Sequence, residues 1–417
     1  GTDTQSYMAN SEVLTGYIDY LIRPGSILDI PAGDILGNGS LGNFTLMPGA
    51  TLVIRDDAGI WASGGGGAIQ VGGARNFSKQ ANYCFYDGPS GYVYSGDGLP
   101  DTVNMLTINN TVSSGWYQEY YSTTVMDTFA LLAGYIDANY DINLNGPVVQ
   151  GTGYIMGSTS VTIRVGGSGP DCVLPVVADG MIRGLVLDRP GRTLSLTGNL
   201  SIFDSLALLN GTLQTGSFGL MFEPNANIVR SSGADLLGLF PPSFAGGVNM
   251  TYGGGTITSG LELPTSLTAI RKLRLLTATD TLVVDRDTMA IGDTLSLPGG
   301  LRFNGKYLNV AGGIDTLVGT GLVQMSDTGT ANFFSGGPPI YLPAIMGGRL
   351  NLNVSAGGAT MRGDISLTNA LVGGPGALTV GPHTLTLGDS SPCAGSSKTD
   401  RASSLVFQGG AIGYVRA

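Results

Sequence analysis

The sequence is poor in charged and in reactive side chains. Of its 417 residues only 12% are charged, and it has three cysteines, two tryptophans and one histidine. Cys84, Cys172 and Cys393 show no CxxC spacing, so zinc-binding and dithiol redox motifs are absent. One disulfide with an odd thiol and three free thiols both remain open. The chain is therefore not a fold built on disulfides.

The single histidine limits the classes of catalysis open to this chain. A Ser-His-Asp or Cys-His site would have to use His383, which follows a proline in the turn-like segment VGPHTLTLG. No serine lies in a GxSxG motif, and the GGGG at 64–67 has no GK[ST] after it. We expect neither nucleophilic catalysis nor a phosphate-binding loop.

Long apolar runs and basic patches are also missing. Without a run of about 18 apolar residues, no membrane span and no signal peptide are expected. The chain starts at Gly1, which favours a processed mature chain or a fragment. No basic patch is present for nucleic acid.

The net charge of -10 is unevenly distributed. Residues 1–141 hold 4 Lys/Arg against 14 Asp/Glu, whereas residues 142–417 hold 16 of each. We interpret this acidity as a solvated surface, with cation binding or a complementary partner as alternatives.

Glycine and short apolar alternations dominate what the sequence does contain. Gly accounts for 68 residues, and 42% of the chain is hydrophobic. Residues 185–222 alternate apolar and polar positions, such as Leu194/Leu196 and Leu206/Leu208, and turn residues interrupt them every few positions. A period of two is typical of strands with one buried face, and these strands are short. A chain that turns this often is most simply winding around a coil.

Internal repetition supports a coil. Residues 185–222, 273–310 and 350–387 can be laid over one another, each opening with an LxL-type pair and ending in a glycine-containing turn. A single rung cannot bury its own apolar face, but stacked rungs share one core. The sequence therefore predicts an all-β, right-handed parallel β-helix (β-solenoid) with loop insertions, including longer loops at 231–260 and 326–348.

Four segments are predicted along the chain. Residues 1–24 form an N-terminal lead-in or cap, and residues 25–111 form a first solenoid segment. Residues 112–141 are rich in aromatics and poor in glycine, which favours an insertion or junction containing one helix or a pair of long strands. Residues 142–417 form a second solenoid segment with loops.

The aromatic segment supplies the candidate surface site. Trp116, Tyr117, Tyr120 and Tyr121 are residue types that anchor interfaces, and such rings also stack on sugars. A cap over the solenoid core, a subunit contact and a carbohydrate-binding patch are the three interpretations, with the cap favoured first.

Enzymes that cleave polysaccharides also use β-helices, and they need clustered carboxylates. The carboxylates of 142–417 are scattered singly, and Asp285–Asp287 is the nearest to a cluster. Asp56 and Asp57 supply too few oxygens for a calcium loop. No catalytic, cofactor-binding or metal-binding residue is therefore expected.

Three runs of sequence suggest a resemblance. The run GNFTLMPGATLVIRDDAGIWASGGGGAIQVGGARNFSKQANYCFYDG, then GDGLPDTVNMLTINNT, then NGTLQTGSFGLMF, resembles repeat segments of secreted surface proteins of Bacteroidota. Those proteins are exported through the type IX system and are adhesin-like. The resemblance covers most of 25–110 and, more loosely, 180–230 and 346–390, and 112–141 departs from it. It implies a β-helical protein located outside the cell or on its surface.

The same resemblance implies O-glycosylation, where Asp precedes Ser/Thr and an aliphatic residue or Met follows. The pattern fits Thr102, Ser205, Thr281, Thr288, Thr294 and Thr316. Turn chemistry at strand entries explains the same tripeptides.

These observations favour a structural extracellular protein, the subunit of a self-assembling cell-surface fibre or filament, or an adhesin stalk. Its expected partner is a second copy of itself in a head-to-tail homopolymer, with glycans or the cell surface as further partners and without nucleic acid or a membrane span. A polysaccharide-active lyase or hydrolase and a carbohydrate-binding adhesin are the alternatives.

Overall fold

The computed structural model consists of strands joined by tight turns. It describes residues 4–6, 17–37, 41–88, 91–111, 115–118, 120–264, 270–311, 313–314, 321–335, 339–354, 357–373, 377–387, 405–406 and 411–414. About 56% of the chain is strand, arranged in parallel sheets that stack as a β-solenoid of about 15 turns. Within the described ranges one 3-10 turn (η1, Ala178–Gly180) occurs and no α-helix. The predicted all-β parallel β-helix is confirmed.

The strands separate into two compact units. Unit 1 comprises Gly1–Phe203, Asn210–Leu220 and Gly238–Phe240, and unit 2 comprises Asp204–Leu209, Met221–Leu237 and Pro241–Ala417. The strands β21 (Leu200–Gln214) and β22 (Leu220–Phe222) contribute residues to both units. None of the described helices is long and apolar enough to cross a membrane.

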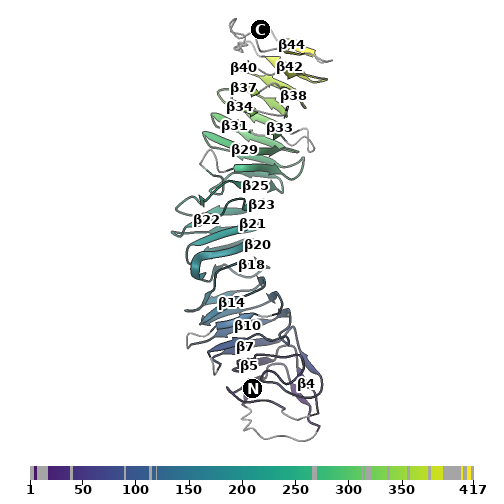
Figure 1. Cartoon of the computed structure of the whole chain (residues 1–417), viewed down its shortest axis with the longest axis vertical. Helices are drawn as coiled ribbons and strands as arrows, with labels where there is room; N and C mark the ends of the chain where they lie inside the picture. Colours follow the sequence, from purple (N-terminus) through teal and green to yellow (C-terminus); the bar gives the residue numbers. More distant parts are fainter. Residues whose placement is uncertain are drawn as a thin grey trace. The chain divides into compact units, whose positions relative to one another are not determined.

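Unit 1 contains four parallel stacks of strands (Figure 1). The first stack is β1 (Thr4–Ser6), β3 (Ile27–Ile30), β5 (Thr51–Ile54), β7 (Asn82–Tyr86), β10 (Met105–Asn109), β13 (Phe129–Ala133) and β16 (Val148–Gln150). The second is β8 (Tyr92–Tyr94), β11 (Gly115–Gln118), β14 (Tyr135–Ala138) and β17 (Tyr154–Ile155), and the third is β2 (Tyr20–Ile22), β4 (Phe44–Leu46) and β6 (Arg75–Phe77). The fourth includes β9 (Thr102–Val103), β12 (Thr123–Val125), β15 (Ile142–Leu144), β18 (Ser158–Gly166), β19 (Cys172–Leu174) and β20 (Met181–Leu196).

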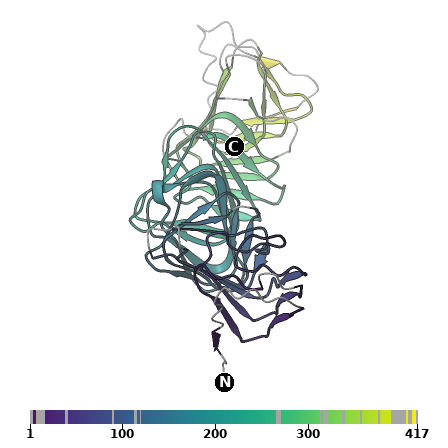
Figure 2. The same cartoon turned by 60° about the horizontal axis from the view of Figure 1, so that its bottom comes forward.

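The described residues of unit 2, drawn in green to yellow in Figure 2, form three stacks of the same kind. The first includes β23 (Asn227–Leu237), β24 (Ser243–Phe244), β25 (Val248–Gly253), β27 (Ile270–Leu275), β29 (Thr288–Ser296), β31 (Tyr307–Val310), β32 (Gly313–Ile314), β34 (Thr330–Ser335), β37 (Arg349–Val354) and β40 (Ala370–Gly373). The second is β26 (Thr256–Thr258), β28 (Thr281–Val284), β30 (Gly300–Phe303), β33 (Leu322–Met325), β36 (Ala344–Met346), β39 (Ile365–Leu367), β42 (Thr384–Leu387) and β44 (Ala411–Tyr414). The third is β35 (Ile340–Leu342), β38 (Ala359–Met361), β41 (Leu378–Thr379) and β43 (Leu405–Val406).

The core follows directly from the alternation in the sequence. Leu52 on β5 pairs with Tyr83 on β7, which pairs with Leu106 on β10, and all three side chains are buried. Where the strands keep this register, the inward side chain of one rung packs on its counterpart in the next. A fully buried aliphatic or aromatic side chain contributes about 1.5–3 kcal/mol, so the repeated rungs stabilise one another.

Residues 112–141, predicted as an insertion or junction containing one helix or a pair of long strands, include short strands of the coil. These strands are β11, β12, β13 and β14, each paired in parallel with strands of neighbouring rungs. Phe129 and Leu131 lie in register with Leu106 and Ile108, and all four are buried. The sequence of this segment is compatible with either a helix or strands. Pairing with the neighbouring rungs makes it form strands.

Two other expectations of shape are corrected. The ranges 231–260 and 326–348, predicted as loops, contribute strands such as β25 and β34 to the stacks. Residues 185–222 were also expected to turn every few residues. In the structure they are interrupted less often, because β20 runs unbroken over Met181–Leu196. It changes direction at Gly191, whose φ of 65° suits glycine, and so turns a corner while its pairing continues. The lead-in 1–24 contributes β1 and β2, which pair with β3 and β4.

Candidate functional site

A row of tyrosines crosses the outer face of the β8–β11–β14–β17 sheet in unit 1. Tyr92, Gly115, Tyr135 and Tyr154 occupy the same register position on the four successive strands. Their sequence neighbours Val93, Trp116, Ile136 and Ile155 are all buried. Because side chains alternate faces along a strand, the tyrosines are directed outward.

Close contacts hold the row together. The rings of Tyr135 and Tyr154 stack with centroids 5.5 Å apart and an interplanar angle of 23°. A Cβ atom on Gly115 would lie 2.3 Å from Cε2 of Tyr135, so the Tyr135 ring covers the glycine between two tyrosine-bearing strands. Burial, and secondly a hydrogen bond with Tyr92, raises the pKa of Tyr135 to about 12. Tyr92 itself is 50% exposed.

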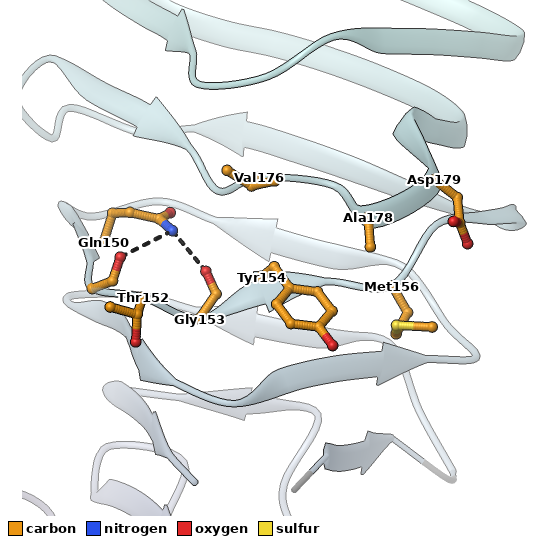
Figure 3. A pocket seen from close by; sticks show the side chains of 9 residues that line it. Gln150, Thr152, Gly153, Tyr154, Met156, Val176, Ala178 and Asp179 are labelled. Atoms are coloured by element: carbon orange, nitrogen blue, oxygen red, sulfur yellow. Dashed lines mark hydrogen bonds between the residues drawn. The ribbon is translucent and has the colours of Figure 1, made fainter. Parts of the chain in front are cut away.

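A pocket of about 580 Å³ lies beside Tyr154 (Figure 3). One wall comes from the end of β16, the following loop and β17, and the other from the next rung. Its lining residues are Gln150, Gly151, Thr152, Gly153, Tyr154, Met156, Val176, Ala178 and Asp179. The volume lies within the range of small-molecule sites.

The near wall of the pocket is fixed by its glycines and by Gln150. Cβ atoms on Gly151 and Gly153 would lie 2.1 Å from the Leu132 carbonyl oxygen and 2.7 Å from Leu131 Cγ, so only glycine allows this loop to lie against the rung below. Gln150 Nε2 donates to the Gly153 carbonyl at 2.7 Å (Figure 3). Its Oε1 is buried and has no hydrogen-bond partner. The loop therefore holds an unpaired acceptor in the pocket wall.

The far wall is formed where the chain departs from strand geometry. Ile155 donates its backbone N–H to the Val176 carbonyl at 2.8 Å, which fixes the two rungs against each other. Beyond Val177 the backbone turns through η1, where Asp179 and Gly180 have φ of 54° and 66°. Positive φ is uncommon for aspartate, and here it places Asp179 at the edge of the pocket.

The predicted aromatic site is divided by the structure. Trp116 is only 1% exposed and packs in the core 5.7 Å from the Phe85 ring, so it is not a surface anchor. Tyr120 and Tyr121 are exposed, with their rings 6.2 Å apart. The side chain of Tyr117 lies outside the described residues. Strand alternation turns Trp116 inward. The sequence could not predict this orientation because it left open whether 112–141 forms a helix or strands.

The tyrosine row was missed because its members are not neighbours in sequence. Tyr92 and Gly115 are separated by 23 residues, Gly115 and Tyr135 by 20, and Tyr135 and Tyr154 by 19. These separations equal the length of one solenoid turn. A search for aromatics at the rung period would have found the row.

The proposed glycosylation positions lie on strands where they are described. Thr102, Ser205, Thr281, Thr288 and Thr294 are all half-buried residues within β9, β21, β28 and β29. Thr316 lies outside the described residues. Modification of these positions stays a prediction.

Cysteines and carboxylates are dispersed among the rungs. Cys84 and Cys172 are free thiols, and burial raises the pKa of each, whereas Cys393 lies outside the described residues. Asp56 accepts the Ala58 N–H at 2.8 Å in a turn, and burial raises its pKa. Across the described part of the chain, no group of three or more His, Cys, Asp or Glu side chains is placed to hold a metal ion.

The remaining charged candidates engage in local contacts. Asp285 accepts a hydrogen bond from Asn304, and Asp287 lies 3.9 Å from the Lys306 ammonium. His383 Nδ1 lies 3.8 Å from Asp364. Each pairing joins adjacent rungs or turns of the coil.

Two buried arginines were not anticipated from sequence. Arg189 is fully buried in unit 1, and Arg230 is 7% exposed in unit 2. The Arg189 guanidinium donates to the carbonyls of Leu144, Gly146, Gly166 and Pro170. A hydrogen-bonded guanidinium can thus satisfy carbonyls that a solenoid corner leaves without strand partners.

The tyrosine row and its pocket together combine flat aromatic surface with a few polar groups, the composition of a small-ligand site. Comparison of the chain with protein-family models, with curated proteins and with solved structures finds no match.

Proposed function

We propose that this chain is a structural element of an extracellular surface protein, a β-solenoid stalk that holds other parts away from the cell. The observation that carries the proposal is the parallel pairing of successive rungs, which repeats the inward and outward positions along the stacks apart from local register shifts such as those in β18 and β27. Such a stack is stiff along its axis because every rung is hydrogen-bonded to both neighbours. The sequence resemblance to Bacteroidota surface repeats supports the location.

Polar ladders on the outside of unit 2 support a load-bearing role. Asn351 Nδ2 donates to Asn332 Oδ1 at 2.7 Å, and Asn332 Nδ2 donates to Asn309 Oδ1 at 2.7 Å. Each bond runs from one rung to the next, parallel to the backbone ladder. Stacked amides of this kind add stability that a single rung does not have.

We further propose that copies of the chain associate head to tail. The edge of a parallel stack presents N–H and C=O groups in the same spacing as its interior, so a strand of a second copy can extend the stack by the same hydrogen bonds. A contact that repeats without closing produces a filament.

Electron microscopy tests both parts. Negative-stain images of the purified protein at increasing concentration are expected to show rods that lengthen into filaments. Compact particles of globular dimensions would contradict the stalk, whereas single rods that never lengthen would contradict only the self-association.

We do not assign an enzymatic activity to this stalk. Incubation with neutral and acidic polysaccharides is expected to release neither reducing ends nor unsaturated products. Turnover that is lost on substitution of a carboxylate would instead favour the lyase or hydrolase alternative.

A further inference from the structure

We infer that the pocket beside Tyr154 binds a pyranose ring of a neutral glycan, stacked against Tyr154. The inference is independent of the stalk proposal, because the site lies wholly within unit 1 and needs no second copy.

The pocket lies at the end of the tyrosine row, beside Tyr154. Tyr135 covers one side of Tyr154, and the rung on the other side presents Val176 and Ala178 to the pocket. These side chains are too small to continue the aromatic stack, and Val176 is 39% exposed. The pocket is therefore the space that the next ring of the row would fill (Figure 3). A flat ring of another molecule fits there.

The walls of the pocket combine apolar surface with polar groups at the rim. Tyr154, Met156 and Val176 offer apolar surface, and a pyranose presents a face of C–H groups that packs on such surface. The hydroxyl of Thr152 and the carboxylate of Asp179 lie at the rim and are suited to the hydroxyls at the edge of a sugar. Both residues are exposed, and the Thr152 hydroxyl also donates to the Leu132 carbonyl at 3.3 Å.

The charge around the pocket disfavours an anionic ligand. Asp179 is the only charged residue among the nine that line the pocket, and no Lys or Arg accompanies it. The preceding third of the chain, residues 1–141, carries the whole net charge of the protein. An anionic polysaccharide would be repelled, so the expected ligand is a neutral glycan.

The tyrosine row extends beyond the strands that border the pocket. Tyr92 remains 50% exposed and Tyr94 37% exposed on β8, two strands from β14. Aromatic surface thus extends away from the pocket across the same sheet. An oligosaccharide that continues along the row is expected to bind more tightly than a monosaccharide.

The test is titration calorimetry of the full chain with neutral oligosaccharides of glucose, mannose, galactose and N-acetylhexosamines, and with oligogalacturonate as the anionic probe. At least one neutral oligosaccharide is expected to bind. The affinity for oligogalacturonate is expected to be at least about tenfold lower, which corresponds to about 1.4 kcal/mol. Failure of every neutral oligosaccharide, or preference for the anionic probe, would overturn the inference.

Variants locate the site. Tyr154→Ala removes the stacking ring and is expected to weaken binding about tenfold or more, whereas Tyr154→Phe keeps the ring and is expected to bind like the parent. Val176→Trp, at an exposed position, is expected to fill the pocket and block binding without disturbing the core. Tyr121→Ala, an exposed tyrosine outside the row, is the matched control.

The outcomes separate this inference from the stalk proposal. If the protein binds glycan yet forms no rods, the glycan-binding inference stands and the stalk proposal is contradicted. Binding that is unchanged in both Tyr154→Ala and Val176→Trp would overturn the inference, whatever the micrographs show.

Discussion

Arg230 donates from Nη1 to Glu262 Oε1 at 2.7 Å in the interior of unit 2, where Arg230 is 7% exposed and Glu262 is fully buried. Glu262 Oε1 also accepts from the Tyr252 hydroxyl at 3.1 Å and from the Gly260 N–H at 3.0 Å. The second oxygen, Oε2, is buried without a partner. This ion pair ties the segment after β26 to β23, 32 residues earlier.

Replacement of Glu262 by Ala is expected to destabilise the protein strongly. It would remove the buried acceptor of Arg230 Nη1 and leave the guanidinium paired only with the more exposed Asp235, which accepts from Nη2 at 3.0 Å. Breaking a buried pair in this way costs about 3–5 kcal/mol. Urea unfolding, read by circular dichroism, measures the loss. Asp287→Ala, which removes one partner of the exposed pair with Lys306, is the control and is expected to leave the midpoint unchanged. Equal midpoints for the two variants would contradict the role assigned to Glu262.

Arg189 is expected to tolerate neither Met nor Lys. Met leaves the buried carbonyls of Leu144 and Gly146 without donors, and each unsatisfied group costs about 1–3 kcal/mol. Lys retains the charge but lacks the five-donor fork that reaches several carbonyls at once. Thermal unfolding is expected to show a lower midpoint for both variants. Arg192→Met, at an exposed position three residues away, should unfold like the parent.

Gly115→Ala is expected to disturb the tyrosine row. The new methyl group would lie 2.3 Å from the Tyr135 ring, which must move, and overpacking of this kind costs about 1–3 kcal/mol. Gly65→Ala serves as the control, because its Cβ would meet no atom within 4 Å and its φ is not positive.

A double variant shows whether the ring is the cause. If the Tyr135 ring is what Gly115→Ala displaces, combining it with Tyr135→Ala should cost less than the sum of the two single changes. Additive losses of unfolding free energy would mean that the glycine is required for another reason.

Stability is expected to fall in alkali partly through Tyr135. Its folded-state pKa of about 12 lies above the ordinary value of 10, so the folded protein holds the phenol proton more tightly than the unfolded chain does. The resulting stabilisation is fully present below pH 10 and is lost as the pH rises towards 12. Urea midpoints at pH 8, 10 and 11.5 measure this loss, and Tyr135→Phe should show a smaller decrease. The same decrease in both proteins would assign alkaline unfolding to other tyrosines.

Much of the fold is predictable because its determinants are local. The pairs Leu52/Ile54 and Leu106/Ile108 show their inward positions by alternation alone, and the structure buries all four. At 112–141 the apolar residues suit one helix or a pair of long strands, and the described residues instead form short strands of the coil. Only pairing with the rungs on either side distinguishes the two, and that pairing joins residues about one turn of the coil apart.

The sites are less predictable because they form between rungs. Trp116 belongs to the aromatic run of the sequence, yet strand alternation buries its side chain. The tyrosines whose rings stack, Tyr135 and Tyr154, come from successive turns of the coil. A contact such as that of Arg189 with Gly146 depends on the length of each intervening turn. A shift of one residue in the pairing register of a strand would turn the side chains of that strand to the opposite face of the sheet.

The sequence by itself determined that this chain is a parallel β-solenoid, because a period of two, frequent glycine turns and repeated segments are local properties with one simple architecture. Only the tertiary structure decided which outward residues share a surface. Rung register brings Tyr92, Tyr135 and Tyr154 into one row, and it places two small side chains beyond that row where a pocket remains. The physical reason is that alternation fixes the face on which a side chain lies, whereas the lengths of the turns fix its neighbours.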